Sequence, residues 1–253
     1  MGFSPISLQS SPRRTEKLFH QSASLFDTTA RVIEVQGNFV VLDRTIFYAE
    51  SGGQEYDTGF IDQFPVVDVQ DQGGRLLTAQ GTRVQIPAIK VDTVVVHKLA
   101  EPATLEVGQE VRLQISQDRR RNLTRSHTAA HFLLQAARML LGKPDDPLYL
   151  KGCHIAEDAC RIDLFGNFDS GQAQEVEVLA NELIARGGPI QMTRSEVSDE
   201  VFYWIWEDVI IPCGGTHVDD ASAVPQLRIS RSKKGQQLTR FKATWLKDAG
   251  QAA

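Results

Sequence analysis

The chain has 253 residues, of which 42% are hydrophobic and 23% are charged, and its 27 basic and 32 acidic residues give a formal net charge of −5. This composition is that of a globular protein of one large or two average domains, and it excludes a general nucleic-acid coat protein. No apolar run reaches the roughly 18 residues that span a membrane, and the N-terminus lacks the pattern of a secretory signal. We therefore expect a cytoplasmic protein without a membrane partner.

Residues 1–15 predict a flexible arm, and the segment that follows predicts a β domain. β-branched residues gather there in short runs separated by glycines, which is typical of a small barrel or sandwich. The expected strands are residues 30–35, 39–42, 91–99 and 111–115. We assign residues 16–117 to this β domain.

The pattern changes near Asp118, where apolar residues begin to recur with a helical period that continues to Leu141. Gly142 ends this predicted helix, and a second helix begins after Asp169 or Ser170 as N-cap and ends at residues 187–189. The expected strands of this half are residues 151–155, 160–164, 208–212, 226–231 and 238–245. Residues 118–253 thus predict an α+β domain.

Two pairs of potential metal ligands stand out in this second half. His127 and His131 are four residues apart on the predicted helix and therefore share one of its faces. Cys213 and His217 are four residues apart in a glycine-containing loop that follows an apolar strand. Three imidazoles and one thiolate form a ligand set that Zn²⁺ accepts. Thr128 occupies the position at which zinc metalloproteases carry their general-base glutamate, which disfavours a protease. We predict one Zn²⁺ per chain.

The glycine-rich segment FYAESGGQEYDTG, residues 47–59, has two interpretations. It can be a plain hairpin connection. Alternatively, Gly52 and Gly53 let the backbone approach a ligand closely, so that the segment and the amide of Gln54 form one wall of a pocket.

Two basic clusters flank the ligand pairs. Such clusters are usually solvated surface, and the alternative is a face that binds a nucleic-acid backbone. They consist of Arg119, Arg120, Arg121 and Arg125, and of Arg228, Arg231, Lys233, Lys234, Arg240 and Lys242.

Four sequence blocks resemble, in this order, the editing region of alanyl-tRNA synthetase and the free-standing alanyl-tRNA editing proteins of the AlaX family. The resemblance covers about residues 15–245 and implies an α+β fold. A small N-terminal β-barrel would precede an α/β two-layer editing domain, an antiparallel sheet with packed helices, like that of alanyl- and threonyl-tRNA synthetases. The blocks are FYAESGGQEYDTG, DRRRNLTRSHTAAHFLLQAARMLLG, KGCHIAEDACRIDL and PCGGTHV.

The resemblance also implies site residues. His127, His131, Cys213 and His217 match the zinc ligands of the family, and Gln54 matches a glutamine near its editing pocket. Three positions depart from many relatives: Ala130 stands for a threonine, Cys153 for a serine, and Arg240 with Phe241 for two arginines. The first two bear on substrate selectivity and the third on contacts with tRNA.

The implied function is that of a trans-editing hydrolase without aminoacylation activity, which deacylates mischarged Ser-tRNA(Ala). Whether Gly-tRNA(Ala) is a second substrate is left open. A tRNA-binding zinc module without hydrolytic activity, or a deacylase of another mischarged tRNA, are the alternatives. Gln54 and Thr216 are the expected catalytic contacts, although Thr216 can equally cap the turn. The expected substrate and tRNA contacts are Gly52, Gly53, Arg120, Arg121, Lys233, Lys234 and Arg240. We expect a monomer or a weak homodimer, and leave open whether zinc activates water or only orients the substrate.

Overall fold

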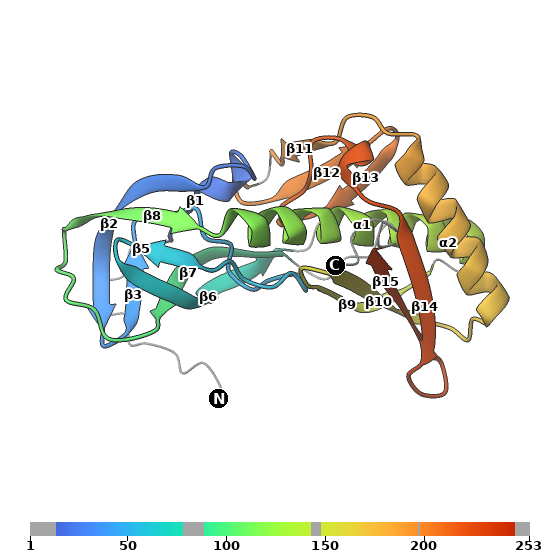
Figure 1. Ribbon diagram of the computed structural model, residues 1–253, viewed down its shortest axis with the longest axis horizontal. Helices are drawn as coiled ribbons and strands as arrows, with labels where there is room; N and C mark the ends of the chain where they lie inside the picture. Colours follow the sequence, from blue (N-terminus) through green and yellow to red (C-terminus); the bar gives the residue numbers. More distant parts are fainter. Residues whose placement is uncertain (1–13, 78–88, 143–147, 197, 246–253) are drawn as a thin grey trace, which may run out of the picture.

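The computed structural model describes residues 14–77, 89–142, 148–196 and 198–245. A long central helix, α1 (Gln117–Leu141), joins a β-barrel at one end of the molecule to an α+β module at the other (Figure 1). Among the described residues, no helix combines the length and apolar character needed to cross a membrane.

The barrel is closed, with strand order β2-β3-β7-β6-β5-β8, which confirms the barrel expected from the sequence. The predicted strands correspond to β2, β3, β7 and β8, whereas β5 and the long β6 were not predicted. Alternation is clear in β8, where Val111, Leu113 and Ile115 are buried and the residues between them are exposed. The bounds are β2 (Asp27–Gln36), β3 (Phe39–Leu42), β5 (Gly59–Ile61), β6 (Phe64–Leu77), β7 (Ile89–Leu99) and β8 (Glu110–Ile115).

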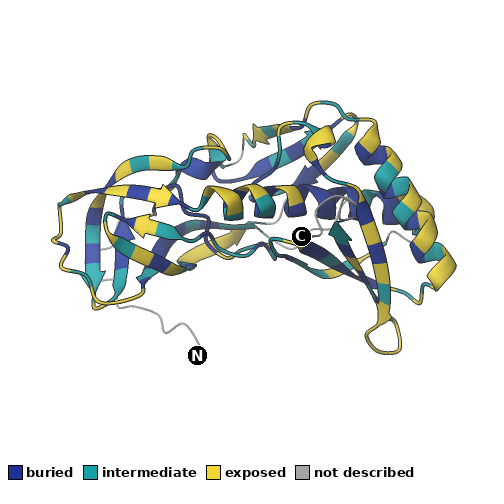
Figure 2. Cartoon of the chain, viewed as in Figure 1, coloured by how far each residue is buried: buried dark blue, intermediate teal, exposed yellow. Residues whose placement is uncertain are grey.

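Ser116 is the N-cap of helix α1, and its hydroxyl accepts a hydrogen bond from the backbone N–H of Arg119 at 3.4 Å. The helix ends at Gly142, as predicted. From Ser126 to Leu134 every residue of the helix is buried (Figure 2). A helix buried all round is expected where structure surrounds it on every side, and α1 is the element around which the second module packs.

The second module contains a four-stranded antiparallel sheet of order β14-β15-β10-β9 and a three-stranded sheet of order β11-β12-β13. Helix α2 (Ser170–Ala185) packs against α1 and β14. The strand bounds are β9 (Leu150–Ile155), β10 (Ala159–Phe165), β11 (Gln191–Arg194), β12 (Phe202–Trp206), β13 (Val209–Pro212), β14 (Leu227–Lys233) and β15 (Leu238–Trp245). The sequence predicted both helices and five of these strands, but neither β11 nor β12.

The chain enters the described structure along the junction of the two modules. β1 (Glu16–Lys17) pairs in parallel with β4 (Arg44–Thr45), and the short helix η1 (Leu18–His20) follows; a second short helix, η2 (Ala221–Ala223), precedes β14. Thr15 is buried, and Arg14 forms an ion pair with Asp199 at 2.6 Å. Residues 1–13 of the predicted arm lie outside the described residues, and the domain bounds 16–117 and 118–253 stay predictions.

Candidate metal centre

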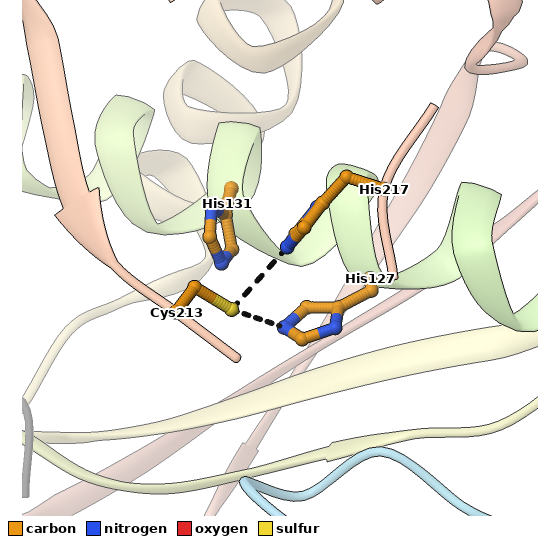
Figure 3. A group of neighbouring side chains, drawn as sticks. All are labelled: His127, His131, Cys213 and His217. Carbon is orange, nitrogen blue, oxygen red and sulfur yellow. Dashed lines mark hydrogen bonds between the residues drawn. The ribbon is translucent and has the colours of Figure 1, made fainter. Parts of the chain in front are cut away.

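The four predicted ligand residues come together beside α1. His127 and His131 project from the same face of the helix, while Cys213 directly follows β13 and His217 lies four residues further on (Figure 3). The potential ligand atoms all lie within 4.8 Å of one another. Cys213 Sγ is 3.4 Å from His127 Nε2 and 3.3 Å from His217 Nε2. This buried cluster can therefore hold a metal ion.

Hydrogen bonds fix the orientation of two of the three imidazoles. His127 Nδ1 lies 2.7 Å from Gln54 Oε1, and because an amide oxygen only accepts, Nδ1 carries the proton and Nε2 keeps its lone pair for the cluster. His217 Nδ1 lies 3.2 Å from the hydroxyl oxygen of Thr128, which itself donates to the Thr124 carbonyl at 3.0 Å. Such partners on the second ring nitrogen are typical of metal-binding histidines.

His131 differs from the other two histidines. Its Nδ1 is buried and has no hydrogen-bond partner among the described residues. Its ring instead makes an edge contact with Trp204, with ring centroids 4.8 Å apart. Packing, rather than a hydrogen bond, therefore orients this imidazole.

Burial controls the protonation of the cluster. Burial lowers the pKa of His127 to about 3, and it lowers the pKa values of His131 and His217 well below the ordinary histidine value. Neighbouring imidazoles lower these last two further, since two adjacent rings resist carrying charge together. Burial also raises the pKa of the Cys213 thiol to about 12. Without a cation the cluster thus holds three neutral imidazoles and a protonated thiol, and a cation would displace the thiol proton on binding.

The residues present fit Zn²⁺. Three neutral imidazoles and one thiol offer nitrogen and sulfur donors, and zinc accepts such sets in tetrahedral sites. Ca²⁺ and Mg²⁺ require oxygen ligands, and none of the four clustered side chains offers an oxygen.

Gln54 and Thr216 lie behind the ligands. Both are buried, and Gln54 Nε2 donates to the Thr216 hydroxyl oxygen at 3.1 Å while its Oε1 accepts from the Thr216 backbone N–H at 3.2 Å. Thr124 also donates to the Thr216 hydroxyl at 3.0 Å. The structure thus brings together the glycine-rich segment, α1 and the loop after β13, which are far apart in sequence.

A cavity of about 390 Å³ opens beside the cluster. This volume lies in the range of small-molecule binding sites. The wall near the ligands is rich in glycine, including the predicted residues Gly52 and Gly53, and the thiol of Cys153 lies there and donates to the Gly52 carbonyl at 3.1 Å. Apolar side chains such as Leu134, Ile162 and Ile211 form another part of the wall.

The predicted tRNA contacts lie in different environments. Arg121, Lys233 and Lys234 are exposed. Arg240 is half-buried and binds both carboxylate oxygens of Asp163, at 2.6 and 2.8 Å. Arg120 is fully buried, and its guanidinium is taken up by protein partners, so it is not available to a phosphate in this structure.

Several residues around the ligands were not predicted. Thr124 and Thr128 precede His127 and His131 by three residues each and so lie near them on the helix. This spacing could have identified the two threonines from the sequence. Gly215 packs against the His127 ring, and His20 lies 3.0 Å from the Gly214 carbonyl, contacts without a local sequence signal. His97, by contrast, lies within the barrel strand β7 and bonds Thr45 at 2.8 Å, away from the cluster.

Comparison with known proteins finds one family model and several relatives. A family model described as tRNA synthetases class II (A) matches residues 14–119. An alanyl-tRNA editing protein AlaX-M from Pyrococcus horikoshii is 31% identical over 234 residues, which cover 92% of this chain and 98% of that protein. Alanine–tRNA ligases from Methanothermobacter thermautotrophicus and Methanococcus vannielii are 32% and 27% identical over 244 residues. These matches cover 88% of this chain but 25% of each ligase, so the chain spans about a quarter of the ligases' length.

Proposed function

Because the chain belongs to the AlaX family of alanyl-tRNA editing proteins, we propose that it is a trans-editing hydrolase that deacylates Ser-tRNA(Ala), with Gly-tRNA(Ala) as a second substrate. The observation that carries this proposal is the convergence of His127, His131, Cys213 and His217 in one cluster, the first three of which line the wall of a cavity. We assign one Zn²⁺ per chain to these four residues. Aminoacylation is not part of the proposal.

The need for such an activity follows from the limits of molecular recognition. A site shaped for alanine cannot strongly exclude the smaller glycine, and an added hydroxyl gives little discrimination in an apolar pocket, so serine also enters. A second site can then remove the wrong amino acid if it binds the serine hydroxyl. Alanine would leave the polar groups of that second site unpaired, which can amount to a discrimination of about 10⁴–10⁵-fold.

The bound metal ion and the residues around it would have different roles in hydrolysis. When bound, Zn²⁺ would supply Lewis acidity for ester hydrolysis, either at the carbonyl or at a water molecule. Gln54 holds the proton of His127 on Nδ1 and so directs Nε2 into the cluster. Thr216 holds Gln54 in place. Because both residues are buried behind the ligands, we propose that they position the site and do not touch the substrate.

The remaining lining residues would receive the aminoacylated end of the tRNA. Gly52 and Gly53 let the backbone approach that end closely, while the apolar wall limits the access of bulk solvent and leaves room for the one water molecule that hydrolysis consumes. We propose that Arg121, Lys233, Lys234 and the partly engaged Arg240 contact the tRNA backbone. Arg120 is left out of this proposal because it is buried.

An assay with three charged tRNAs tests the function. Zinc-loaded protein is incubated with Ser-tRNA(Ala), Gly-tRNA(Ala) and Ala-tRNA(Ala), and release of each amino acid is followed. We expect loss of the seryl ester and stability of the alanyl ester. The matched control is the double variant His131→Ala with Cys213→Ala, which should lose zinc and activity together. Intact esters on all three tRNAs would overturn the enzymatic proposal and leave a binding module, and full turnover by the metal-free double variant would overturn the site.

The choice of tRNA is tested separately. Serine is kept constant as the amino acid while the acceptor stem is exchanged for that of another tRNA. Faster hydrolysis of the alanine-type stem supports the proposed specificity, whereas equal or faster hydrolysis of the exchanged stem would point to a deacylase of a different mischarged tRNA.

A further inference from the structure

We propose that Arg119 and Arg120 form an arginine clamp that holds the glycine-rich loop, residues 47–58, against α1 and thereby sets the hydrogen bond between Gln54 and His127. Both arginines would be positioning residues for a metal ligand, although they belong to a basic run that the sequence associates with tRNA. The inference builds on the metal site of the proposed function, but not on the identity of the substrate.

Arg120 closes the loop at its base. Its side chain is fully buried, and its Nε lies 3.2 and 3.1 Å from the two carboxylate oxygens of Asp57. Its Nη2 donates to the Ile46 carbonyl at 2.6 Å, directly before the loop. Asp57 in turn accepts from the Tyr48 backbone N–H at 2.8 Å. One guanidinium on α1 thus joins both ends of the loop.

Arg119 holds the residues that directly follow Gln54. Its Nε donates to the Tyr56 carbonyl at 2.9 Å, and its Nη2 forms an ion pair with Glu55 at 3.0 Å. Its Nη1 pairs with Glu157, in the turn between β9 and β10. The side chain is 16% exposed, so most of its surface is covered by these contacts.

Of the two clamp residues, Arg120 lies on the same face of the helix as the two histidine ligands. Arg120, Thr124, His127 and His131 follow the spacing i, i+4, i+7 and i+11, which repeats on one side of an α-helix. Arg120 and His127 are about 10 Å apart along the axis at 1.5 Å per residue. The loop runs parallel to this face, because Asp57 meets Arg120 and Gln54 meets His127.

The opposite side of Gln54 is held by β9. Ile155 accepts from the Glu55 backbone N–H at 3.1 Å, and its own N–H donates to the Gly53 carbonyl at 2.7 Å. These bonds fix the loop to the sheet, while the arginines fix it to the helix. The distance between Gln54 and His127 therefore depends on the clamp, since the histidine belongs to the helix.

The chemistry of the clamp requires arginine. The planar guanidinium can bind a carboxylate with two parallel hydrogen bonds and still donate to a carbonyl, whereas lysine offers a single point charge. Arg120 uses this geometry fully, and its burial excludes a contact with tRNA. Arg119 is the better residue to test, because its partial exposure makes a folded variant attainable.

The test is a double-mutant cycle of Arg119→Ala and Gln54→Ala with zinc affinity as the readout, measured by competition with a chelator. Loss of a partner that orients a metal ligand weakens metal binding about 10–100-fold, and we expect Arg119→Ala to reach the lower end of this range. In the Gln54→Ala background the same substitution should have little further effect, because the clamp acts through Gln54. The control Arg112→Ala removes an exposed pair with Asp27 on the barrel and should leave zinc affinity unchanged.

Kinetics give a second readout. With Ser-tRNA(Ala), Arg119→Ala should lower kcat and leave KM and the salt dependence of tRNA binding unchanged. Three outcomes would each overturn the clamp. Arg119→Ala could keep a zinc affinity within about twofold of the wild type, or it could weaken zinc binding as much in the Gln54→Ala background as in the wild type. It could also reduce the salt dependence of tRNA binding while leaving kcat unchanged. Zinc affinity needs no charged tRNA, so absence of hydrolysis by the wild-type protein would overturn the proposed function alone.

Discussion

Gly215 lies against the proposed metal ligand His127 and against Gln54, the hydrogen-bond partner of that histidine. A Cβ at this position would collide with the His127 ring and would lie 2.9 Å from Gln54 Oε1. We expect Gly215→Ala to displace one of these side chains and to weaken zinc binding by about tenfold or more, because the orientation of a ligand depends on its partner. Zinc content after dialysis against a chelator measures this effect.

Gly214 provides the matched control one residue earlier. A Cβ there would have His20 Nε2 as its nearest neighbour, at 3.9 Å, which is an ordinary van der Waals contact. We expect Gly214→Ala to retain zinc. Equal zinc content in the two variants would contradict the steric role of Gly215.

His97 predicts a pH dependence of stability that is independent of the metal. The ring is buried between Thr45 and the Val40 carbonyl, and burial lowers its pKa from 6.5 to about 4. Between these values the unfolded chain binds a proton that the folded chain excludes, so the free energy of unfolding falls as the pH decreases from about 6.5 to about 4. The total contribution is about 3 kcal/mol.

The variant His97→Gln isolates this contribution. Glutamine does not titrate, so urea unfolding of the variant should lose less stability than the wild type across the same pH window. Subtracting the free energies of unfolding of the two proteins at each pH cancels the contributions of the other histidines, since these are common to both. Parallel stability profiles would show that His97 does not remain neutral in the folded protein.

Helix α2 illustrates an element whose start is determined by its own sequence. Asp169 accepts from the Gln172 backbone N–H and the Gln172 side chain accepts from the Asp169 N–H, both at 2.9 Å, which forms a capping box. We expect Asp169→Ala to lower the free energy of unfolding by about 1 kcal/mol in urea denaturation. Zinc affinity should not change, because α2 contributes no side chain to the cavity wall. A parallel loss of zinc would show that α2 supports the metal centre through α1.

The sequence predicted elements with strong local signals and missed those that depend on distant partners. Both helices have caps and a clear period, and β13 precedes the cysteine loop as an apolar run. The long strand β6 carries Asp68, Asp71 and two glycines, residues that are unfavourable in strands, and its pairing with β7 decides its conformation. The aromatic run of β12 has a composition that favours a strand, although no strand was predicted there.

The metal cluster was predictable because each half has a fixed local spacing, whereas the residues that support it come from elsewhere in the molecule. Gln54 is 73 positions from His127, and Asp57 is 63 positions from Arg120. Only the closed barrel and the central helix bring them together. For the same reason the burial of Arg120 could not be predicted from a run of three arginines, which alone suggests an exposed basic surface. We propose that the barrel of residues 16–117 and the editing domain of residues 118–253 are both required for the complete site.

The distribution of charge over the whole molecule bears on the proposed binding of tRNA. With a formal net charge of −5, the protein repels a polyanion except where basic residues gather. Lys233 ends β14 and Lys234 follows it in the exposed hairpin before β15, which projects from the sheet (Figure 1). An exposed hairpin of this kind can follow a phosphate backbone without entering the cavity.

The variant Lys233→Ala with Lys234→Ala should therefore weaken tRNA binding and reduce the salt dependence of the affinity by about one counterion for each phosphate that the protein no longer neutralises. Zinc affinity should stay the same, since neither lysine belongs to the ligand cluster or lines the cavity beside it. The control Arg186→Ala removes a positive charge from the C-cap of α2, where it pairs loosely with Glu207 at 3.9 Å, and should leave the salt slope unchanged. If both variants reduce affinity equally, the overall charge and not the hairpin governs the approach of tRNA. If the hairpin contacts the tRNA backbone, the lysine variant alone should show a smaller slope of log affinity against log salt concentration. This slope counts the counterions released by local phosphate neutralisation and does not report the net charge of the protein.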